Sequence, residues 1–314
     1  MANADSTNDA ISLGQKQADE ILARRKSARE RRASVLSAHS GRLELTVNVA
    51  TTAGALAAVN LQTAGFLVAA GDSWFDYPLY DVLKLLDDNY GYNLESSAHR
   101  GDPIEEMAYQ GGQLDTFARC LEKVTSHGAM PKAVLLSGGG DDIAGAEFGM
   151  LLNNATSNIA GWNDEVVDGV INQRIFSAFT FMLGSINRLC QQSVGKVLPV
   201  FVHGYDYPVP DGRGFLGGWP FPGPWLQPGF REKLFTDLPT NIGLLHQIID
   251  KFNNMLTARL QPAFANLHYV DLRNTLSTVL ANDTYKDWWG NELHPTEKGF
   301  SAITDKFAAE LAKL

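Results

Sequence analysis

Short apolar runs recur along the chain and alternate with longer segments that have the pattern of amphipathic helices. The apolar runs lie at Gly65–Ala70, Ala133–Leu136, Val197–Val202 and Leu267–Leu272. Runs of this length predict strands. Pro199 lies inside the third run and weakens the case for a central strand there, because proline cannot donate a ladder hydrogen bond.

Helix-like segments separate these runs. They lie at Tyr80–Asp88, Leu114–Val124, Phe176–Gln192, Ile242–Leu260 and Thr296–Leu314. Strands that alternate with helices of this length predict a parallel sheet covered on both faces, which is a three-layer α/β/α fold. Chemistry in such sheets gathers beyond the carboxyl ends of the strands. We therefore expect functional residues directly after the apolar runs.

Residues 11–37 form a charged segment that is rich in helix formers and has only a thin apolar stripe. This pattern predicts a peripheral helix that docks on the main body or on a second subunit, as in a homo-oligomer. We expect residues 1–40 to carry this helix and residues 41–314 to form the main domain. The basic residues between Arg24 and Arg32 are interpreted as a solvated face, since the chain as a whole is acidic.

The composition is that of an ordinary globular protein. Of the 314 residues, 45% are apolar and 19% are charged, and this length suffices for one large domain or two small ones. The formal net charge of −9 argues against nucleic-acid binding, which needs a basic face. Cys120 and Cys190 form neither a disulfide framework nor a zinc-type spacing, and we expect two buried, reduced thiols.

The first residues lack the basic and apolar regions of a signal peptide, and we expect a cytoplasmic protein. Leu45–Gly71 contains no charged side chain and is long enough to cross a bilayer. However, it is built largely from Ala, Thr, Gly, Asn and Gln, and these residues insert poorly. We therefore expect no membrane span.

The stretch AAGDSWFDY, Ala69 to Tyr77, is the first that suggests chemistry. Gly71 permits a tight turn after the predicted strand, and Ser73 follows at the edge of the sheet. A serine in this position is either the N-cap of a helix or a nucleophile. This stretch alone favours the helix cap, but the residues at the other strand ends favour the nucleophile.

Three further stretches carry candidate residues. Gly101 in SSAHRGDPIEEM offers an unobstructed backbone N–H, or it is a simple turn glycine. The glycines of LLSGGGDDI suit a close backbone approach at a strand-to-helix turn, although Asp141 or Asp142 in that stretch also fits a helix cap. His294 in WWGNELHPTEKGF lies in a polar loop, where proton transfer is a reasonable role.

Together these stretches resemble the SGNH (GDSL-type) hydrolase family, over about Phe66 to Leu314. The four blocks of the family occur in order; each is weak alone, and together they are fairly specific. The blocks are Gly71-Asp72-Ser73, Gly101, Gly139-Gly140-Asp141-Asp142 and Asn291-Glu292-Leu293-His294-Pro295. The resemblance implies a flavodoxin-like α/β/α fold, ester hydrolysis, and neither a cofactor nor a metal ion.

By this resemblance, Ser73 is the nucleophile and His294 is its general base. The oxyanion hole combines the backbone N–H groups of Ser73 and Gly101 with the side chain of Asp141. Ester hydrolysis needs such an activated hydroxyl and such donors, directed at the developing oxyanion.

The chain departs from the family pattern at two positions. Asp141 stands where the family usually has Asn, and an ionised carboxylate cannot donate a hydrogen bond. The loss of one oxyanion donor costs roughly 10²–10³ in rate. Asn291 stands where the family usually has Asp, and this change lowers the turnover of a serine protease by about 10⁴.

Several alternatives preserve activity despite these departures. We expect His294 to be oriented by Asn291 itself, by Glu292 or by Asp287. Alternatively, a backbone carbonyl orients it in a Ser-His dyad. Asp141 can still donate a hydrogen bond to the oxyanion if burial keeps it protonated.

The stretch Gly204–Phe230 is rich in proline and aromatic residues, and its length predicts a packed functional loop. We expect its aromatic residues to wall the acyl or alcohol pocket. Trp74, His203 and Tyr205 are candidate substrate contacts, although packing beneath this loop is an equal alternative for His203 and Tyr205.

The sequence thus predicts a serine ester hydrolase of the esterase or lipase type, which acts on a small molecule, a lipid or an acylated sugar. The alternative is a catalytically reduced SGNH fold used for binding, which Asp141 and Asn291 together motivate. Acyl transfer in place of hydrolysis stays open.

Overall fold

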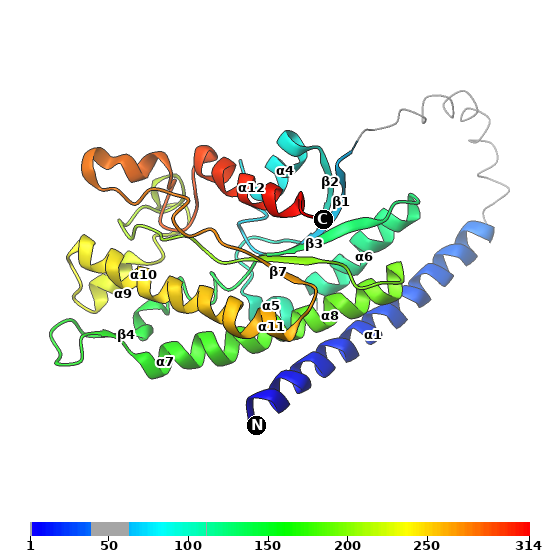
Figure 1. Ribbon diagram of the computed structural model, residues 1–314, viewed down its shortest axis with the longest axis horizontal. Coiled ribbons are helices and arrows are strands. Elements are labelled where there is room, and N and C mark those ends of the chain that lie inside the picture. The colour runs from blue at the N-terminus through cyan, green and yellow to red at the C-terminus, as the bar shows by residue number, and fades with distance from the viewer. Residues whose placement is uncertain (1, 39–62, 111) are drawn as a thin grey trace.

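The computed structural model describes residues 2–38, 63–110 and 112–314, and a parallel sheet lies at the centre of these residues (Figure 1). The strands are β1 (Gly65–Ala70), β2 (Tyr92–Ser96), β3 (Pro131–Leu136), β6 (Val200–His203) and β7 (Leu267–Val270). Their order is β2-β1-β3-β6-β7, and each neighbouring pair is parallel. This is the strand order of flavodoxin-like sheets, so the predicted fold class is confirmed.

Helices cover both faces of the sheet. On one face lie α4 (Val82–Tyr90) and α12 (Glu297–Leu311), and on the other lie α5 (Ile104–Tyr109), α6 (Gly112–Ser126) and α8 (Phe176–Val194) (Figure 1). The second layer continues in α10 (Leu238–Met255), η2 (Gly169–Ile175) and η4 (Leu256–Leu260). The shorter elements are η1 (Phe148–Leu151), β4 (Leu152–Asn153), β5 (Gly161–Trp162), α7 (Asp164–Asp168), η3 (Phe215–Gly217), α9 (Gln227–Glu232), α11 (Gln261–Ala263) and η5 (Ala281–Asp287).

The apolar runs predicted the inner strands well. β1 has the predicted bounds, and β3 and β7 differ from the prediction by two residues at one end. β6 begins at Val200, directly after Pro199, and lies between β3 and β7. The proline therefore precedes the ladder and does not interrupt it. β2 was not predicted, because it is mostly half-buried and contains Asn, Glu and Ser in place of an apolar run.

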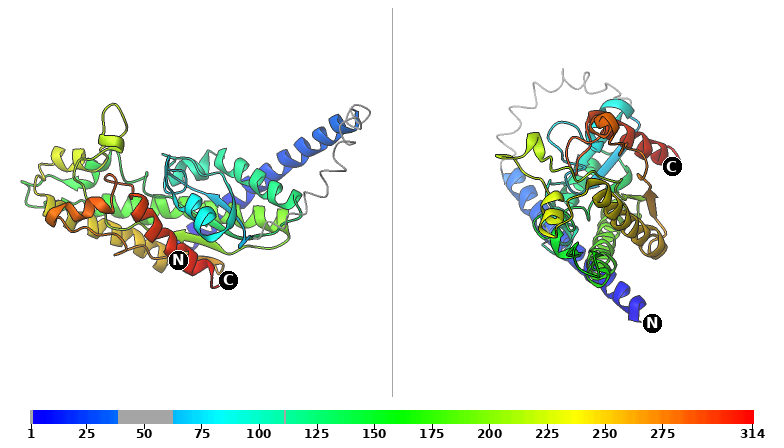
Figure 2. Two further views of the ribbon diagram at one scale, coloured as in Figure 1. Left: turned by 90° about the horizontal axis from the view of Figure 1, so that it is seen from above. Right: turned by 90° about the vertical axis from the view of Figure 1, so that its left-hand side faces the viewer.

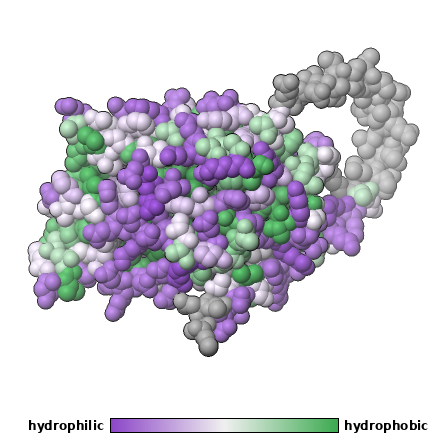
Figure 3. All heavy atoms as spheres, in the orientation of Figure 1, coloured by the Kyte–Doolittle hydropathy of each residue, from purple (hydrophilic) through white to green (hydrophobic). Residues whose placement is uncertain are grey.

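The core lies between the sheet and its helices. Leu67–Ala70 of β1 and Ala133–Leu136 of β3 are fully buried, as expected for inner strands of a parallel sheet with helices on both faces. Hydrophilic side chains predominate on the face shown in Figure 3, and apolar side chains are scattered among them.

Helix α1 (Ala2–Ala38) lies along α8, outside the second helical layer, and its last turns extend past the body (Figures 1 and 2). The hydroxyl of Ser185 donates to the carbonyl of Gly14 at 2.8 Å. Further along the helix, Arg25 forms an ion pair with Glu122 of α6. The predicted N-terminal helix is therefore present and docks on the main body, and a contact with a second subunit stays a prediction.

The described part of the chain contains no helix that combines the length and the apolar character needed to cross a membrane. Most of the charge-free stretch Leu45–Gly71 lies outside the described residues, and its last residues form β1. Cys120 and Cys190 are buried, free thiols, as predicted.

Candidate active site

The predicted site residues come from segments that follow the strands. Ser73 follows β1, Gly101 follows β2 and Asp141 follows β3, while His294 lies just before α12. The strand order reverses between β1 and β3, and ligands of open α/β sheets bind at this point, beyond the carboxyl ends of the strands. The site therefore occupies the position that the topology favours.

The turn that carries Ser73 is held by its surroundings. Gln113 of α6 accepts a hydrogen bond from the Gly71 N–H at 3.0 Å and donates one to the Gly71 carbonyl at 2.9 Å. A Cβ atom on residue 71 would lie 2.8 Å from Cβ of Ser137, so glycine is needed there. The next helix, α4, begins only at Val82, and Ser73 therefore does not act as an N-cap.

Ser73 and His294 lie within hydrogen-bond distance. Ser73 Oγ is 2.7 Å from Nε2 of His294, and both residues are buried. Nδ1 of His294 is 3.1 Å from Oδ1 of Asn291. Because an amide oxygen can only accept, Nδ1 carries the proton, and Nε2 accepts from the serine hydroxyl. The imidazole is thus in the tautomer that can take the Ser73 proton.

Neighbouring groups fix the orientation of the Asn291 amide. Its Oδ1 also accepts the backbone N–H groups of Leu293 and His294, both at 2.9 Å. Its Nδ2 donates to the Tyr77 hydroxyl at 3.1 Å. A rotated amide would point its own N–H groups at these donors, so the oxygen must face His294. Asn291 orients the imidazole as an Asp does, but it carries no negative charge.

Aromatic rings enclose the imidazole. Tyr77 stacks on His294 with ring centres 4.3 Å apart and 22° between the planes. Trp225 meets the same ring edge-on, with the centres 5.7 Å apart. Burial disfavours the charged imidazolium and lowers the pKa of His294 to about 3. His294 is therefore neutral over most of the pH range, but it is a weak base.

The other proposed partners of His294 have different contacts. Glu292 is buried and accepts hydrogen bonds from four backbone N–H groups of the Pro-rich loop (Gly204–Phe230). These N–H groups belong to Gly212, Trp225, Leu226 and Gln227. In the described residues, the backbone carbonyl of Asp287 accepts from Thr296, and no hydrogen bond joins Asp287 to His294. Asn291 is thus the group that contacts Nδ1 of the imidazole.

Asp141 shares the walls of two cavities with Ser73. Its Oδ2 atom is buried and has no hydrogen-bond partner among the described residues. Burial is the main cause that raises the pKa of Asp141 to about 8, and the charges of Asp72, Asp142 and Asp102 add to the effect. At neutral pH the carboxyl is therefore mostly protonated and can donate a hydrogen bond.

Asp142 caps a helix. Its carboxylate accepts the N–H groups of Ile104 and Glu105, in the first turn of α5, at 2.7 and 3.3 Å. The capping alternative thus applies to Asp142, although it caps an earlier helix and not the one that follows. Within the described ranges, no group of three or more His, Cys, Asp or Glu side chains is arranged to hold a metal ion.

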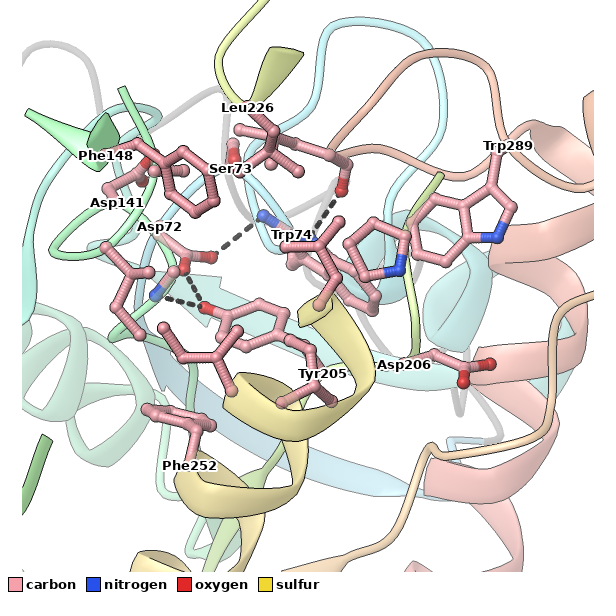
Figure 4. Close-up of a pocket in the computed structure, with 18 residues that line it drawn as sticks. Asp72, Ser73, Trp74, Asp141, Phe148, Tyr205, Asp206, Leu226, Phe252 and Trp289 are labelled. Carbon is pink, nitrogen blue, oxygen red and sulfur yellow. Dashed lines mark hydrogen bonds between the residues drawn. The ribbon is translucent and has the colours of Figure 1, made fainter. Parts of the chain in front are cut away.

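Two cavities meet at Ser73, Asp141 and Leu293. The outer cavity has a volume of about 410 Å³ and is lined by Gly101, His294, Tyr77, Phe215, Phe221 and Trp225. The inner cavity has a volume of about 70 Å³ and is lined mainly by buried apolar side chains (Figure 4). Aromatic residues of the Pro-rich loop therefore wall the outer cavity, in agreement with the role expected of that loop.

The three candidate substrate contacts lie in different places. Trp74 and Tyr205 line the inner cavity. The Tyr205 hydroxyl accepts from the Gly140 N–H at 3.1 Å and donates to the Asp72 carboxylate (Figure 4). His203 is fully buried against Trp74, with ring centres 5.4 Å apart, and it lines neither of these two cavities. This position agrees with the packing alternative for His203, and a substrate contact through this residue stays a prediction.

Sequence reasoning did not find every residue of the site. Tyr77 lies in the same short stretch as Ser73, and its aromatic ring beside a predicted nucleophile was the available signal. Gln113 lies directly before the predicted helix Leu114–Val124 and gave no signal. Leu245, Ile248 and Phe252 of α10 line the inner cavity, but their helical spacing is also that of an ordinary core face.

No family model matches the sequence. No curated protein matches it either. The chain is similar to a protein from Streptococcus pneumonia that is provisionally named a platelet activating factor, with 14% identity and a TM-score of 0.44 over 89% of this chain and 98% of that one. A provisionally named GDSL-like lipase from Parabacteroides merdae is 11% identical, with a TM-score of 0.39 over 81% and 98% of the two chains.

A third similar structure is a catalytic mutant of an acetylxylan esterase from Geobacillus stearothermophilus. It is 13% identical, with a TM-score of 0.38 over 81% of this chain and 96% of that one. Because these three TM-scores are below 0.5, the interpretation of the site rests on its own residues.

Proposed function

We propose that this protein hydrolyses carboxylic esters through an acyl intermediate on Ser73. The observation that carries the proposal is the 2.7 Å contact between Ser73 Oγ and Nε2 of His294, whose Nδ1 is held by Asn291. A hydroxyl, a neutral base and a group that orients the base are the parts of an activated serine. Ser73 and His294 also line the same cavity, which gives a substrate access to both.

In the first half-reaction, Ser73 Oγ attacks the carbonyl carbon of the ester, and the hydroxyl proton passes to Nε2 of His294. The carbonyl oxygen becomes the oxyanion of a tetrahedral intermediate. Nε2 then gives the proton to the alcohol oxygen as the C–O bond breaks. The alcohol leaves, and the acyl group remains bound to Ser73.

In the second half-reaction, the oxygen of a water molecule attacks the acyl carbon and one of its protons passes to Nε2 of His294. The second tetrahedral intermediate collapses with cleavage of the bond to Ser73 Oγ, which takes the proton back from Nε2. The products are a carboxylic acid and the free enzyme.

The oxyanion is stabilised by the backbone N–H groups of Ser73 and Gly101 and by protonated Asp141. Gly101 and Asp141 line the same cavity as Ser73, and Oδ2 of Asp141 lacks a partner in the described residues, which supports this role. A buried neutral carboxylic acid acts as an oxyanion donor in ketosteroid isomerase. Once ionised, Asp141 would repel the oxyanion instead, so this donor works only below its pKa of about 8.

A fluorophosphonate probe tests the nucleophile. After incubation at pH 7, we expect mass spectrometry to find one adduct, on Ser73, and none in Ser73→Ala. Ser126→Ala changes an exposed serine and is the matched control that should keep the adduct. An adduct on another residue, or no adduct, contradicts the proposal.

A panel of p-nitrophenyl esters tests the reaction itself. Turnover that disappears in Ser73→Ala supports hydrolysis at this serine, whereas turnover that survives the substitution excludes it. Binding of esters without any turnover by the unmutated protein would favour the alternative of a catalytically reduced binding protein.

A further inference from the structure

The two cavities contact Ser73 from different sides. His294 and Gly101 line only the outer cavity, whereas Trp74 and Phe252 line only the inner one. Ser73 belongs to both. An ester with its carbonyl carbon at Ser73 Oγ therefore extends one of its halves into each cavity.

The position of His294 decides which half lies where. In the proposed mechanism, Nε2 gives its proton to the oxygen of the leaving alcohol. Such a transfer needs the two atoms within about 2.6–3.2 Å. The alcohol must therefore lie beside His294 in the outer cavity, and the acyl group extends past Ser73 into the inner cavity.

The lining of the inner cavity selects an uncharged, apolar group. Its walls include Phe148, Leu226, Leu245, Ile248, Phe252 and Trp289, all of them buried. Figure 4 shows Phe148 and Leu226 on one side of the cavity and Phe252 on the opposite side. Among the described residues that line it, none is basic, and three are acidic: Asp72, Asp141 and Asp206. A carboxylate on the acyl group would lose its hydration there and would find no positive charge to compensate for the loss.

Two of these three acids are already occupied by hydrogen bonds. The Asp206 carboxylate accepts the backbone N–H groups of Tyr207, Asn274, Thr275 and Leu276. The Asp72 carboxylate accepts from Trp74, Ser137 and Tyr205. Asp141 alone has an unpartnered oxygen, at the junction of the two cavities where the ester carbonyl lies. The rest of the inner cavity thus offers an acyl chain apolar contacts.

The size of the inner cavity limits the length of the chain. A water-sized group occupies roughly 10–15 Å³, so a cavity of about 70 Å³ holds on the order of five such groups. The outer cavity, at about 410 Å³, is several times larger and is bordered by aromatic rings. The acyl part of the substrate is therefore the short half, and the alcohol part is the bulky half.

We propose that the inner cavity is an acyl site for an uncharged aliphatic group of about four to six carbons, and that the outer cavity holds a bulky alcohol. This inference rests on the proposed ester hydrolysis at Ser73, and it names the substrate class of that site.

A series of p-nitrophenyl esters, from acetate to dodecanoate, tests the length limit with one leaving group. We expect kcat/KM to rise with each methylene, by up to roughly tenfold per step, to a maximum between butanoate and hexanoate. A hemisuccinate ester of matched length should react at least about 100-fold more slowly than its uncharged counterpart. A flat length profile, or equal use of the charged ester, overturns the inference.

Variants on the two sides of Ser73 test the assignment of the cavities. Leu245→Ala enlarges the inner cavity and should raise the octanoate-to-butanoate ratio of kcat/KM roughly tenfold. Because this variant also removes buried packing, Ala144→Leu provides a second test at a half-buried position of the same wall. It fills the cavity and should lower the hexanoate-to-acetate ratio by a similar factor.

Phe221→Ala alters the outer cavity and should instead change the preference between naphthyl and ethyl butanoate. Val166→Ala, at an exposed position of α7, is the control that should change neither preference. If Leu245→Ala or Ala144→Leu alters the alcohol preference but not the acyl preference, the assignment of the cavities is overturned. The proposed hydrolysis at Ser73 would still stand in that case. Absence of both turnover and a Ser73 probe adduct overturns the inference together with the proposed function.

Discussion

Oδ1 of Asn291 lies 3.1 Å from Nδ1 of His294 and accepts two backbone N–H groups beside it. A Ser-His-Asp triad has a carboxylate oxygen in this position. The amide oxygen fixes the same tautomer and ring orientation, but it has no charge to stabilise the imidazolium of the proposed reaction. Burial lowers the pKa of His294 to about 3. The chain therefore has the geometry of an activated serine with weakened electrostatic support.

Asn291→Asp should supply the missing charge. We expect kcat at pH 7 to rise at least about tenfold, because the equivalent change in the opposite direction costs a serine protease about 10⁴. The Tyr77 hydroxyl, which now accepts from the Asn291 amide, can donate to the new carboxylate, so the site accommodates the substitution. The measurement is steady-state turnover of a p-nitrophenyl ester.

The matched control for this charge change is Asn163→Asp, at the N-cap of α7, which should leave kcat unaltered. If Asn291→Asp folds normally and turns over no faster than the unmutated protein, the neutral orienting group does not limit the reaction.

The pH dependence of activity should report Asp141. Because the pKa of Asp141 is raised to about 8, we expect kcat/KM to fall above that pH as the oxyanion donor becomes an anion. Asp141→Asn should abolish this alkaline fall. The kcat/KM of Asp141→Asn should exceed that of the unmutated protein by a small factor at pH 7 and by roughly 10²–10³ at high pH. A pH-rate profile of both proteins checks this, and an alkaline limb that persists in Asp141→Asn assigns it to another group.

Replacement of Asp141 should also change the pH dependence of stability. Its pKa is about 8 in the folded protein, against 3.8 as its ordinary value. The contribution of Asp141 to the free energy of unfolding is therefore complete below about pH 4. It is lost as the pH rises through 8, because the unfolded chain releases the proton first. Relative to the unmutated protein, Asp141→Asn should gain stability with rising pH, by on the order of 1–3 kcal/mol at pH 9. Urea unfolding at pH 4 and pH 9 measures the difference, which should widen with pH.

Much of the fold was predictable because inner strands of a parallel sheet are buried on both faces. β1 and β3 consequently appear as apolar runs, and residues after them, such as Ser73 and Asp141, could be placed at one edge of the sheet. β2 lies at the edge of the sheet with half-buried residues and left no such pattern. The positions of the candidate reacting groups could therefore be predicted from the ends of the strands.

The surroundings of those groups could not be predicted in the same way. The stacking of Tyr77 on His294 joins two segments that are remote along the chain, and no local pattern records it. Leu245 faces a cavity, although its spacing on α10 is also that of a core residue. Glu292 was one of several alternatives for the group that orients His294, and its contacts with backbone N–H groups of the loop could not be predicted, because they come from residues remote along the chain.

Glu292→Gln should loosen the Pro-rich loop. The Glu292 carboxylate accepts four loop N–H groups at 2.7–3.0 Å, and an amide would turn one N–H group toward these donors. We expect a loss of about 1–3 kcal/mol in the free energy of unfolding. Limited proteolysis should cut residues 204–230 faster, and kcat should fall because Trp225 packs against His294. Glu232→Gln, at an exposed position of α9, is the control; equal proteolysis of both variants would contradict the anchoring role.

The same substitution at two helical glycines should have opposite effects if α1 is docked on α8. A Cβ atom at Gly14 of α1 would lie 2.2 Å from the carbonyl oxygen of Phe181, whereas nothing lies within 4 Å of one at Gly243 of α10. Gly243→Ala should stabilise the protein by up to about 1 kcal/mol, since alanine favours helix. Gly14→Ala should destabilise it by about 1–3 kcal/mol, because the two helices must move apart. Thermal unfolding measures both, and a gain at both positions would show that α1 does not pack on α8 in solution.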